Sequence, residues 1–421
     1  MLVYKFGGAS VADPSRMAAL LPILKENTQP VLIVISALGK TTNALENIVN
    51  HACRDEKPKA QWLASMLEQQ HLDYARRLLK GNFLTIATKV LNNYFAELNE
   101  AVLKADTFNY DFSYDQIVGM GEIFSSCLFS NFLLQNDIKN EWVDARLLIR
   151  TDDTYRDAIV DYEYSLMQAK QLIEVPLLKG LFVVTQGFIG ATEAGNTTTL
   201  GREGSDYSAA IIAAMLNAES VTIWKDVEGL LNADPKLFPN TIKIDRITYK
   251  EVIEMAFFGA QIIHPKTIKP LQNNNIPLYI KCFFDKDKQG TIITDDVEEI
   301  AYPPIIVLKE NQILIQVITR DFSFITEENL SKLYEIFHIL KIKINLIQNA
   351  AISFIACIDN REDKVKSLIH ELSKNYKVLN NDNVSLLTIR HYNTDIITEL
   401  TKNRNLLLQQ ITRKTMQVVM K

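Results

Sequence analysis

The ten residues from Thr197 to Asp206 include groups that could bind an anion: three threonines, two glycines, Arg202 and Ser205. They also include two carboxylates, Glu203 and Asp206. The segment 207–216, rich in alanine and isoleucine, predicts a helix directly after them. Backbone N–H groups at a helix N-terminus attract negative charge, and Ser205 or Asp206 could cap this helix. Asp206 would repel a phosphate unless a lysine or a metal ion lay between them. Taken alone, the stretch fits a glycine-rich helix start without a ligand equally well.

Lys5 stands near the end of the first predicted strand, residues 2–6, and directly precedes Phe6 and the pair Gly7 and Gly8. A helix capped by Asp13 is expected to follow the glycines. The lysine comes before the glycines, whereas in the Walker phosphate loop it comes after them. We therefore expect Lys5 to point toward whatever the glycine turn holds, and the alternative is a surface lysine beside an ordinary turn.

The same order of strand, polar loop and helix recurs along the chain. Residues 31–35 form a second apolar strand, followed by Ser36 and Thr42, and Glu122 lies in a later apolar helix. Helical periodicity covers 44–103 and 115–135. Further strands are predicted at 141–146 and 220–224, and segment 181–190 predicts a strand followed by a glycine-bounded turn. Repeated units of this kind predict an open parallel α/β sheet, which binds ligands beyond the carboxyl ends of its strands.

The composition is that of a globular protein long enough for two or three domains. The 421 residues have a formal net charge of −5, which argues against nucleic acid or an anionic membrane as a partner and favours small molecules. The four cysteines lack C-x-x-C spacing, so we expect reduced thiols and no zinc site. Neither a signal peptide nor an apolar run of membrane-spanning length is recognisable, so a cytoplasmic location is expected.

Six motifs together resemble those of the aspartokinases, and they follow the family's order from Val3 to about Thr294. They are Lys-Phe-Gly-Gly-Ala-Ser at 5–10, Ser36 to Asn43, Gly121-Glu122, Thr197 to Asp206, Lys-Asp-Val-Glu-Gly at 225–229, and Phe-Gly-Ala-Gln-Ile-Ile-His-Pro at 258–265. The family's versions are K-F-G-G-T-S, S-A-x-x-G-x-T-N, G-E, T-T-T-L-G-R-G-G-S-D, D-V-x-G and F-G-A-K-V-L-H-P. The resemblance implies the α/β amino-acid-kinase fold, an open and mainly parallel sheet between helices.

The resemblance also implies transfer of the γ-phosphoryl group of ATP to the side-chain carboxylate of L-aspartate. The product would be 4-phospho-L-aspartate, at the start of the pathway to lysine, threonine and methionine. Such a transfer needs aligned groups and neutralised charge rather than covalent chemistry by the protein. Lys5 would hold the transferring phosphoryl group and Asp206 would position Lys5 or the metal. Mg2+ is expected on the ATP phosphates, and no side-chain ligand is assigned to it.

By the same resemblance, the remaining site residues divide into two groups. The acceptor group comprises Ser36, Thr42, Glu122, Phe188, Arg202 and Ser205. Within it, Arg202 would clamp the α-carboxylate and Glu122 would suit the ammonium. The nucleotide group comprises Lys5, Gly7, Gly8, Lys225, Asp226, Leu231, Lys236 and Gln261.

Three departures from the family's motifs bear on activity, and Leu231 and Lys236 also replace a frequent tyrosine and arginine near the nucleotide. Ala9 replaces a threonine, Glu203 replaces a glycine, and Gln261 stands where many members have a phosphate-contacting lysine. Lys225 occupies a position that is often threonine, so we expect it to supply the nucleotide-side charge from the neighbouring loop. The sequence provides no physical reason for the added negative charge of Glu203.

Pro303 and Pro304 predict a linker between a kinase domain at 1–302 and a regulatory region at 303–421. The elements expected after it are strand 312–319, helix 327–341, strands 344–349 and 352–358, helix 362–375, strand 384–391, and a final helix and strand. This order resembles one α+β ACT domain followed by a shortened second one, which implies a homodimer. Segment 345–351 lacks the hydroxyls with which the family binds effectors, so inhibition by lysine or threonine is expected to be weak or absent.

Two other functions remain open from the sequence. One is a kinase of the same fold that acts on glutamate, N-acetylglutamate or a nucleoside monophosphate, which Arg202, Glu122 and the ACT-like region oppose. The other is a catalytically impaired amino-acid sensor, suggested by the three departures and opposed by the retention of Lys5 and Asp206. No dehydrogenase extension is recognisable, so a monofunctional kinase is expected.

Overall fold

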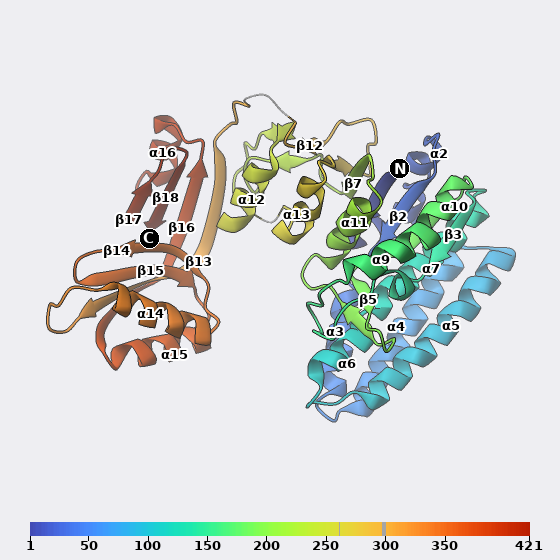
Figure 1. Ribbon diagram of the computed structural model, residues 1–421, viewed down its shortest axis with the longest axis horizontal. Coiled ribbons are helices and arrows are strands. Elements are labelled where there is room, and N and C mark those ends of the chain that lie inside the picture. Colours follow the sequence, from blue (N-terminus) through green and yellow to red (C-terminus); the bar gives the residue numbers. More distant parts are fainter. Residues whose placement is uncertain (261, 297–299) are drawn as a thin grey trace. The chain divides into compact units, whose positions relative to one another are not determined.

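The computed structural model describes residues 1–421 except 261 and 297–299 (Figure 1). The chain divides into two compact units. The first comprises Met1–Leu230, Lys243–Ile253 and Ile262–Ile300, and the second comprises Leu231–Ile242, Glu254–Gln261 and Ala301–Lys421. The domain boundary at residues 302 and 303 stays a prediction.

An eight-stranded sheet organises the first unit, in the order β10-β12-β11-β7-β1-β2-β4-β3. Its strands are β1 (Leu2–Phe6), β2 (Val31–Ile35), β3 (Asn140–Val143), β4 (Phe182–Gln186), β7 (Ser220–Lys225), β10 (Arg246–Ile247), β11 (Leu278–Cys282) and β12 (Thr291–Ile293). Neighbouring strands of this sheet pair in parallel, except for β11 with β12, which are antiparallel. The prediction of an open, mainly parallel sheet is therefore confirmed.

The register of the central strands places their carboxyl ends side by side. Lys5 of β1 pairs with Val34 of β2 and with Ile223 of β7. All five residues of β2 are buried, as expected for an apolar strand covered on both faces. The loops that follow β1, β2 and β4 consequently meet at one edge of the sheet.

Helices of the first unit pack against this sheet, and Figure 1 shows them around the strands. Their bounds are α1 (Pro14–Ala18), α2 (Leu21–Lys25), α3 (Thr41–Ala52), α4 (Lys57–Leu78), α5 (Gly81–Lys104), α6 (Tyr110–Val118), α7 (Met120–Gln135), α8 (Ala145–Leu148), α9 (Tyr162–Ala169), α10 (Val175–Leu178), α11 (Gly204–Met215) and α13 (Pro265–Asn273). Shorter elements are the 3-10 turn η1 (Gly8–Val11), the π-turn η2 (Lys170–Glu174), β5 (Ile189–Ala191), β6 (Thr197–Thr199) and β9 (Lys243–Ile244). Helix α7 contacts β2, β3 and β4, whereas α11 contacts β1, β2 and β7.

The run formed by α6 and α7 bears on the expectation that no apolar run reaches membrane-spanning length. Within the described residues, Tyr110–Gln135 is long and apolar enough by composition to cross a membrane. However, 94% of its most apolar window is buried inside the protein. Burial of this kind is typical of the core helix of a globular unit, and Gly119 separates α6 from α7.

The second unit contains a six-stranded antiparallel sheet in the order β14-β15-β13-β16-β18-β17. Its elements are β13 (Ile305–Thr319), α14 (Glu327–Ile339), β14 (Ile344–Asn349), β15 (Ser353–Asp359), α15 (Glu362–Ser373), β16 (Tyr376–Arg390), α16 (Thr394–Thr401), β17 (Leu406–Ile411) and β18 (Thr415–Met420). Two further elements, β8 (Leu230–Leu231) and α12 (Tyr249–Phe258), cross the division between the units in sequence.

The ACT-like order predicted from the sequence is present, with two differences. Strands β13 and β16 each have 15 residues and pair along most of their length, so each begins earlier than predicted. The final segment forms two strands, β17 and β18, where one was expected, because residues 412–414 make a turn in which Thr412 N–H donates to the Thr415 carbonyl. The α+β character predicted for this region is confirmed.

Candidate active site

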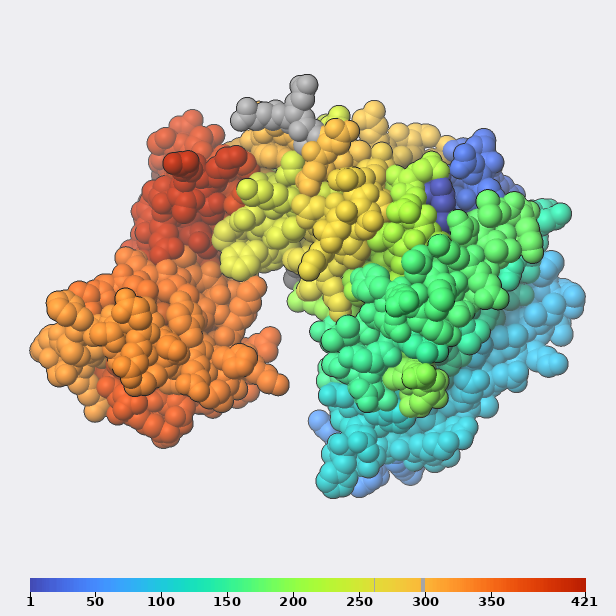
Figure 2. All heavy atoms as spheres, in the orientation of Figure 1, coloured from blue at the N-terminus to red at the C-terminus, as the bar shows by residue number. Residues whose placement is uncertain are grey.

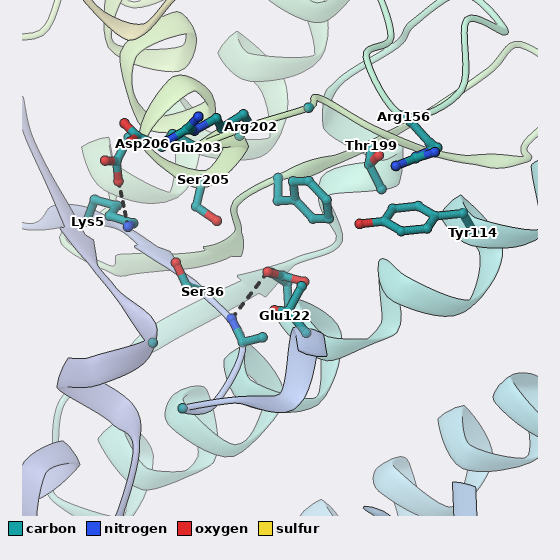
Figure 3. A pocket seen from close by; sticks show the side chains of 17 residues that line it. Lys5, Ser36, Tyr114, Glu122, Arg156, Thr199, Arg202, Glu203, Ser205 and Asp206 are labelled. Carbon is teal, nitrogen blue, oxygen red and sulfur yellow. Dashed lines mark hydrogen bonds and ion pairs between the residues drawn. The ribbon is translucent and has the colours of Figure 1, made fainter. Parts of the chain in front are cut away.

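A cavity of about 500 Å³ lies at the edge where the loops after β1, β2 and β4 meet. Figure 3 shows its lining side chains. They come from six segments of the sequence and comprise Lys5, Gly8, Ser36, Ala37, Gly39, Thr42, Tyr114, Glu122, Arg156, Phe188, Thr199, Gly201, Arg202, Glu203, Gly204, Ser205 and Asp206. The structure thus brings together the first-strand lysine, the polar loop after β2 and the stretch Thr197 to Asp206.

Lys5 and Asp206 form a buried ion pair on one side of the cavity. The Lys5 Nζ atom lies 2.5 Å from Asp206 Oδ1, and the two side chains are only 10% and 7% exposed. The lysine that the sequence required between Asp206 and a phosphate is therefore supplied by β1. An ammonium held in this way keeps its position while leaving further donors for an anionic oxygen.

The loops after β1 and β2 pack so closely that residue 8, near the Lys5–Asp206 pair, has to be a glycine. A β-carbon added to Gly8 would lie 2.8 Å from the Ala37 carbonyl oxygen, so only glycine fits without a shift. The Gly39 N–H donates to the Gly8 carbonyl across the same contact. The loops after β1 and β2 are consequently joined backbone to backbone. Gly7 lies beside them, and a β-carbon there would be 3.5 Å from Lys5 Nζ.

Helix α11 starts differently from the prediction. Glu203 occupies the N-cap position with a left-handed φ of 54°, and its side chain makes no capping bond. Ser205 and Asp206 lie within the first turn, so they do not cap the helix and instead face the cavity. The residues Thr197–Thr199, for which no strand was predicted, form the short strand β6 paired with β5.

The structure supplies a physical reason for Glu203. Its Oε2 atom accepts a hydrogen bond of 2.7 Å from the backbone N–H of His264, the residue that caps α13. The carboxylate therefore joins the start of α11 to the start of α13. This bond accounts for an acidic residue at a position where the backbone favours glycine.

Glu122 is a buried carboxyl group with an unused oxygen. It is 4% exposed, and Oε1 accepts a long hydrogen bond of 3.4 Å from Ala37 N–H. Among the described residues, Oε2 has no hydrogen-bond partner. Burial raises the pKa of Glu122 to about 8, while the Ala37 bond and the Lys5 charge act in the opposite direction. A buried carboxyl of this kind is suited to bind a ligand's ammonium group.

The other residues predicted on the acceptor side also line the cavity: Ser36, Thr42, Phe188, Arg202 and Ser205. Phe188 has a left-handed φ of 70°, and its N–H donates to Ser208 Oγ at 2.9 Å. Arg202 is exposed at the start of α11. Together with Glu122, this side of the cavity presents both signs of charge.

The residues predicted on the nucleotide side are distributed differently. The Lys225 Nζ atom donates to the Ile262 carbonyl at 2.8 Å, and Asp226 is exposed after β7. Neither lines the 500 Å³ cavity. Leu231, in β8, and the exposed Lys236 belong to the second unit. Gln261 lies outside the described residues.

Sequence reasoning assigned no role in the site to Tyr114 and Arg156, which line the cavity, and it noted Thr199 only as one of three threonines that could bind an anion. It also missed Asp115, a fully buried carboxylate that accepts hydrogen bonds from Thr199 and Arg156. Thr199 was available as a hydroxyl within the glycine-rich stretch. An acidic residue at the start of an apolar helical run was the only local signal for Asp115.

Comparison with known proteins agrees with this geometry. The sequence model described as the amino acid kinase family matches residues 1–282. Lysine-sensitive aspartokinase 3 of Escherichia coli K12 is 31% identical over 405 residues, covering 92% of this chain and 86% of that protein. The bifunctional aspartokinase/homoserine dehydrogenase 2 of Arabidopsis thaliana is 32% identical over 301 residues, covering 70% of this chain and 32% of that protein. The chain thus spans about a third of the bifunctional relative's length.

Solved structures extend the likeness over the whole chain. E. coli aspartokinase III in complex with lysine and aspartate is 26% identical with a TM-score of 0.82, covering all of this chain and 95% of that one. The same enzyme in complex with aspartate and ADP is 27% identical with a TM-score of 0.78, covering all of this chain and 96% of that one. The fold and cavity define a kinase of the amino acid kinase family. Within that family, the chain belongs to the aspartokinases.

Proposed function

We propose that the chain transfers the γ-phosphoryl group of ATP to the β-carboxylate of L-aspartate, giving 4-phospho-L-aspartate. The observation that carries this proposal is the joint presence, in one cavity, of the Lys5–Asp206 pair and the unsatisfied Glu122 carboxyl. The pair suits the phosphoryl group and the carboxyl suits the amino acid's ammonium. The aspartate and ADP complexes of the E. coli relative support the same assignment.

Each residue's task follows from its surroundings. The ammonium of Lys5 is held by Asp206 and directed at the transferring phosphoryl oxygens, where it neutralises charge that spreads in the transition state. Glu122 and Arg202 would orient the acceptor so that its free carboxylate faces the phosphorus. No covalent intermediate on the protein is required.

Mg2+ would be held mainly by the phosphates. Among the residues that the structure describes, no group of three His, Cys, Asp or Glu side chains could hold a metal ion. Asp206, the carboxylate beside Lys5, is already paired with that lysine. This donor set fits an ion that keeps water and phosphate ligands, and the bound ion would supply further charge neutralisation.

The proposal is tested by ADP release with ATP and Mg2+, comparing L-aspartate with L-glutamate, N-acetyl-L-glutamate and UMP, with hydroxylamine present to trap an acyl phosphate. Aspartate-dependent ADP with a trapped hydroxamate is expected. Turnover of another acceptor would show that this kinase fold acts on a substrate other than aspartate. No turnover with any of the four, together with retained aspartate binding, would indicate a sensor instead.

Lys225 is proposed to contact the nucleotide in place of a lysine at position 261. Within the described part of the chain, the Lys225 ammonium donates one hydrogen bond, to the Ile262 carbonyl, so its other two donors remain for a phosphate. Lys225→Ala should raise the KM for ATP about tenfold, the scale of one lost bond to a charged group, and leave the KM for aspartate within about twofold. Lys179→Ala, at an exposed lysine of the same unit and outside the 225–229 motif, is the matched control. An unchanged KM for ATP would count against the proposal that Lys225 contacts the nucleotide in place of a lysine at position 261.

Feedback inhibition by lysine is predicted to be weak or absent. Segment 345–351 carries no hydroxyl, and the Asn345 amide is engaged: it donates to Gln312 and Asp359 and accepts from Lys309, at 2.8 to 2.9 Å. These groups are therefore not free to bind an effector. A lysine titration of the initial rate checks this, and half inhibition at a sub-millimolar concentration would overturn it.

Two further proposals rest on the family. We propose a homodimer held through the ACT-like sheet, which sedimentation of a monomer at micromolar concentration would refute. We also propose a cytoplasmic location.

A further inference from the structure

Arg156 lines the acceptor cavity from an unusual backbone conformation. Its φ of 69° lies in the left-handed region, which an arginine adopts only when its surroundings hold it there. Glycine would take this conformation without strain. Backbone strain of this kind is concentrated at binding and catalytic sites, so the Arg156 side chain is a candidate for a role in ligand binding.

A buried carboxylate holds the Arg156 backbone in place. Asp115 Oδ2 accepts hydrogen bonds from Arg156 N–H at 3.0 Å and from Thr199 N–H at 2.8 Å, while Oδ1 accepts from Thr199 Oγ1 at 2.7 Å. Asp115 is fully buried in α6. It therefore joins α6, β6 and the segment that carries Arg156, and both of its partners line the cavity.

The Arg156 guanidinium can change its carboxylate partner. It lies 4.6 Å from the centre of the Tyr114 ring and 3.1 Å from Asp111 Oδ1, in an ion pair whose side chains are 48% and 61% exposed. Exposed pairs of this kind stabilise little, so a ligand carboxylate can replace Asp111. In Figure 3, Arg156, Tyr114 and Thr199 lie on the side of the cavity away from Lys5, with Glu122 between.

The charges of an amino-dicarboxylate match this arrangement. One carboxylate must face Lys5 to be phosphorylated, and the ammonium can meet the unused oxygen of Glu122. The second carboxylate needs a cation, and the cavity's cations besides Lys5 are Arg156 and Arg202. We propose that Arg156 is a specificity-determining residue that exchanges Asp111 for the acceptor's α-carboxylate, beside Arg202. This inference rests on the proposed aspartate kinase activity.

Arg156→Gly tests the inference without threatening the fold, because glycine keeps the N–H that Asp115 accepts and favours the observed φ. The KM for L-aspartate should rise about tenfold or more, as expected for a lost bond between charged groups, with the KM for ATP within about twofold. A rise of less than threefold in the KM for aspartate would overturn the inference.

Asp111→Asn is the matched control, because it removes the resting ion pair and leaves the guanidinium. Its KM for aspartate should be unchanged or lower, since the competing carboxylate is gone. An increase equal to that of Arg156→Gly would show that the ion pair matters only for the structure, and would also overturn the inference.

L-Isoasparagine, in which an amide replaces the α-carboxylate, identifies the group that Arg156 binds. The wild-type preference for aspartate, measured as the ratio of kcat/KM values, should fall about tenfold in Arg156→Gly. An unchanged ratio would exclude recognition of the α-carboxylate. Absence of wild-type turnover on aspartate would refute the proposed function, whereas an active enzyme with a normal Arg156→Gly variant would refute this inference alone.

Discussion

Replacing Lys5 with alanine should lower kcat about 10²- to 10³-fold, the scale on which one preorganised stabilising group acts, or about 2.7–4 kcal/mol. The reason is that Lys5 is held at 2.5 Å by Asp206 at the end of β1, beside the glycine turn proposed to approach the phosphates. Water admitted by the substitution cannot reproduce a fixed ammonium. Steady-state ADP release measures the effect, and near-normal turnover would remove Lys5 from the mechanism.

The control for this variant must separate chemistry from folding, because breaking a buried ion pair destabilises a protein by about 3–5 kcal/mol. Lys5→Arg keeps the positive charge beside Asp206 and should fold, yet its longer, planar group cannot occupy the ammonium position, so kcat should still fall at least tenfold. Lys25→Ala, at an exposed lysine in α2, makes the same charge change away from the cavity and should leave kcat within about twofold. Circular dichroism and thermal unfolding establish that each variant is folded.

Glu122 should make aspartate binding depend on pH. Its pKa is raised to about 8 by burial, so most molecules of the free enzyme carry a neutral carboxyl at pH 7. Binding of the substrate ammonium requires the ionised form, and affinity scales with its fraction. The KM for aspartate should therefore fall more than about tenfold as the pH rises from 6.5 to 8.5, while the KM for ATP changes little.

Glu122→Gln conserves volume but cannot ionise, and it supplies the test of this assignment. The variant should lose the pH dependence and keep a high KM for aspartate throughout the range. If the KM of the variant still changes with pH near pH 6, we would assign that change to Asp115, because burial raises the pKa of this carboxyl to about 6. A wild-type KM for aspartate that is flat from pH 6.5 to 8.5 would contradict the proposed role of Glu122.

Local patterns in the sequence predicted the parts of this protein that depend on neighbours in the chain. Strands 2–6 and 31–35 were predicted with their observed bounds, and Asp13 caps α1 as expected. The local spacing of apolar residues determines such elements. When the strands alternate with helices they form a parallel sheet, whose strands all have their carboxyl ends at one edge. The cavity lined by Lys5, Glu122 and Asp206 follows from this topology together with the family motifs.

Contacts between distant residues were decided only by the tertiary structure. Asp115 holds Arg156 and Thr199, which are 41 and 84 positions away, and Glu203 binds His264, 61 positions away. No local preference links such pairs, because each bond forms only after the sheet has brought its loops together. Burial then leaves one Glu122 oxygen without a partner and raises the pKa of that carboxyl, a property of the packed interior rather than of the residue type.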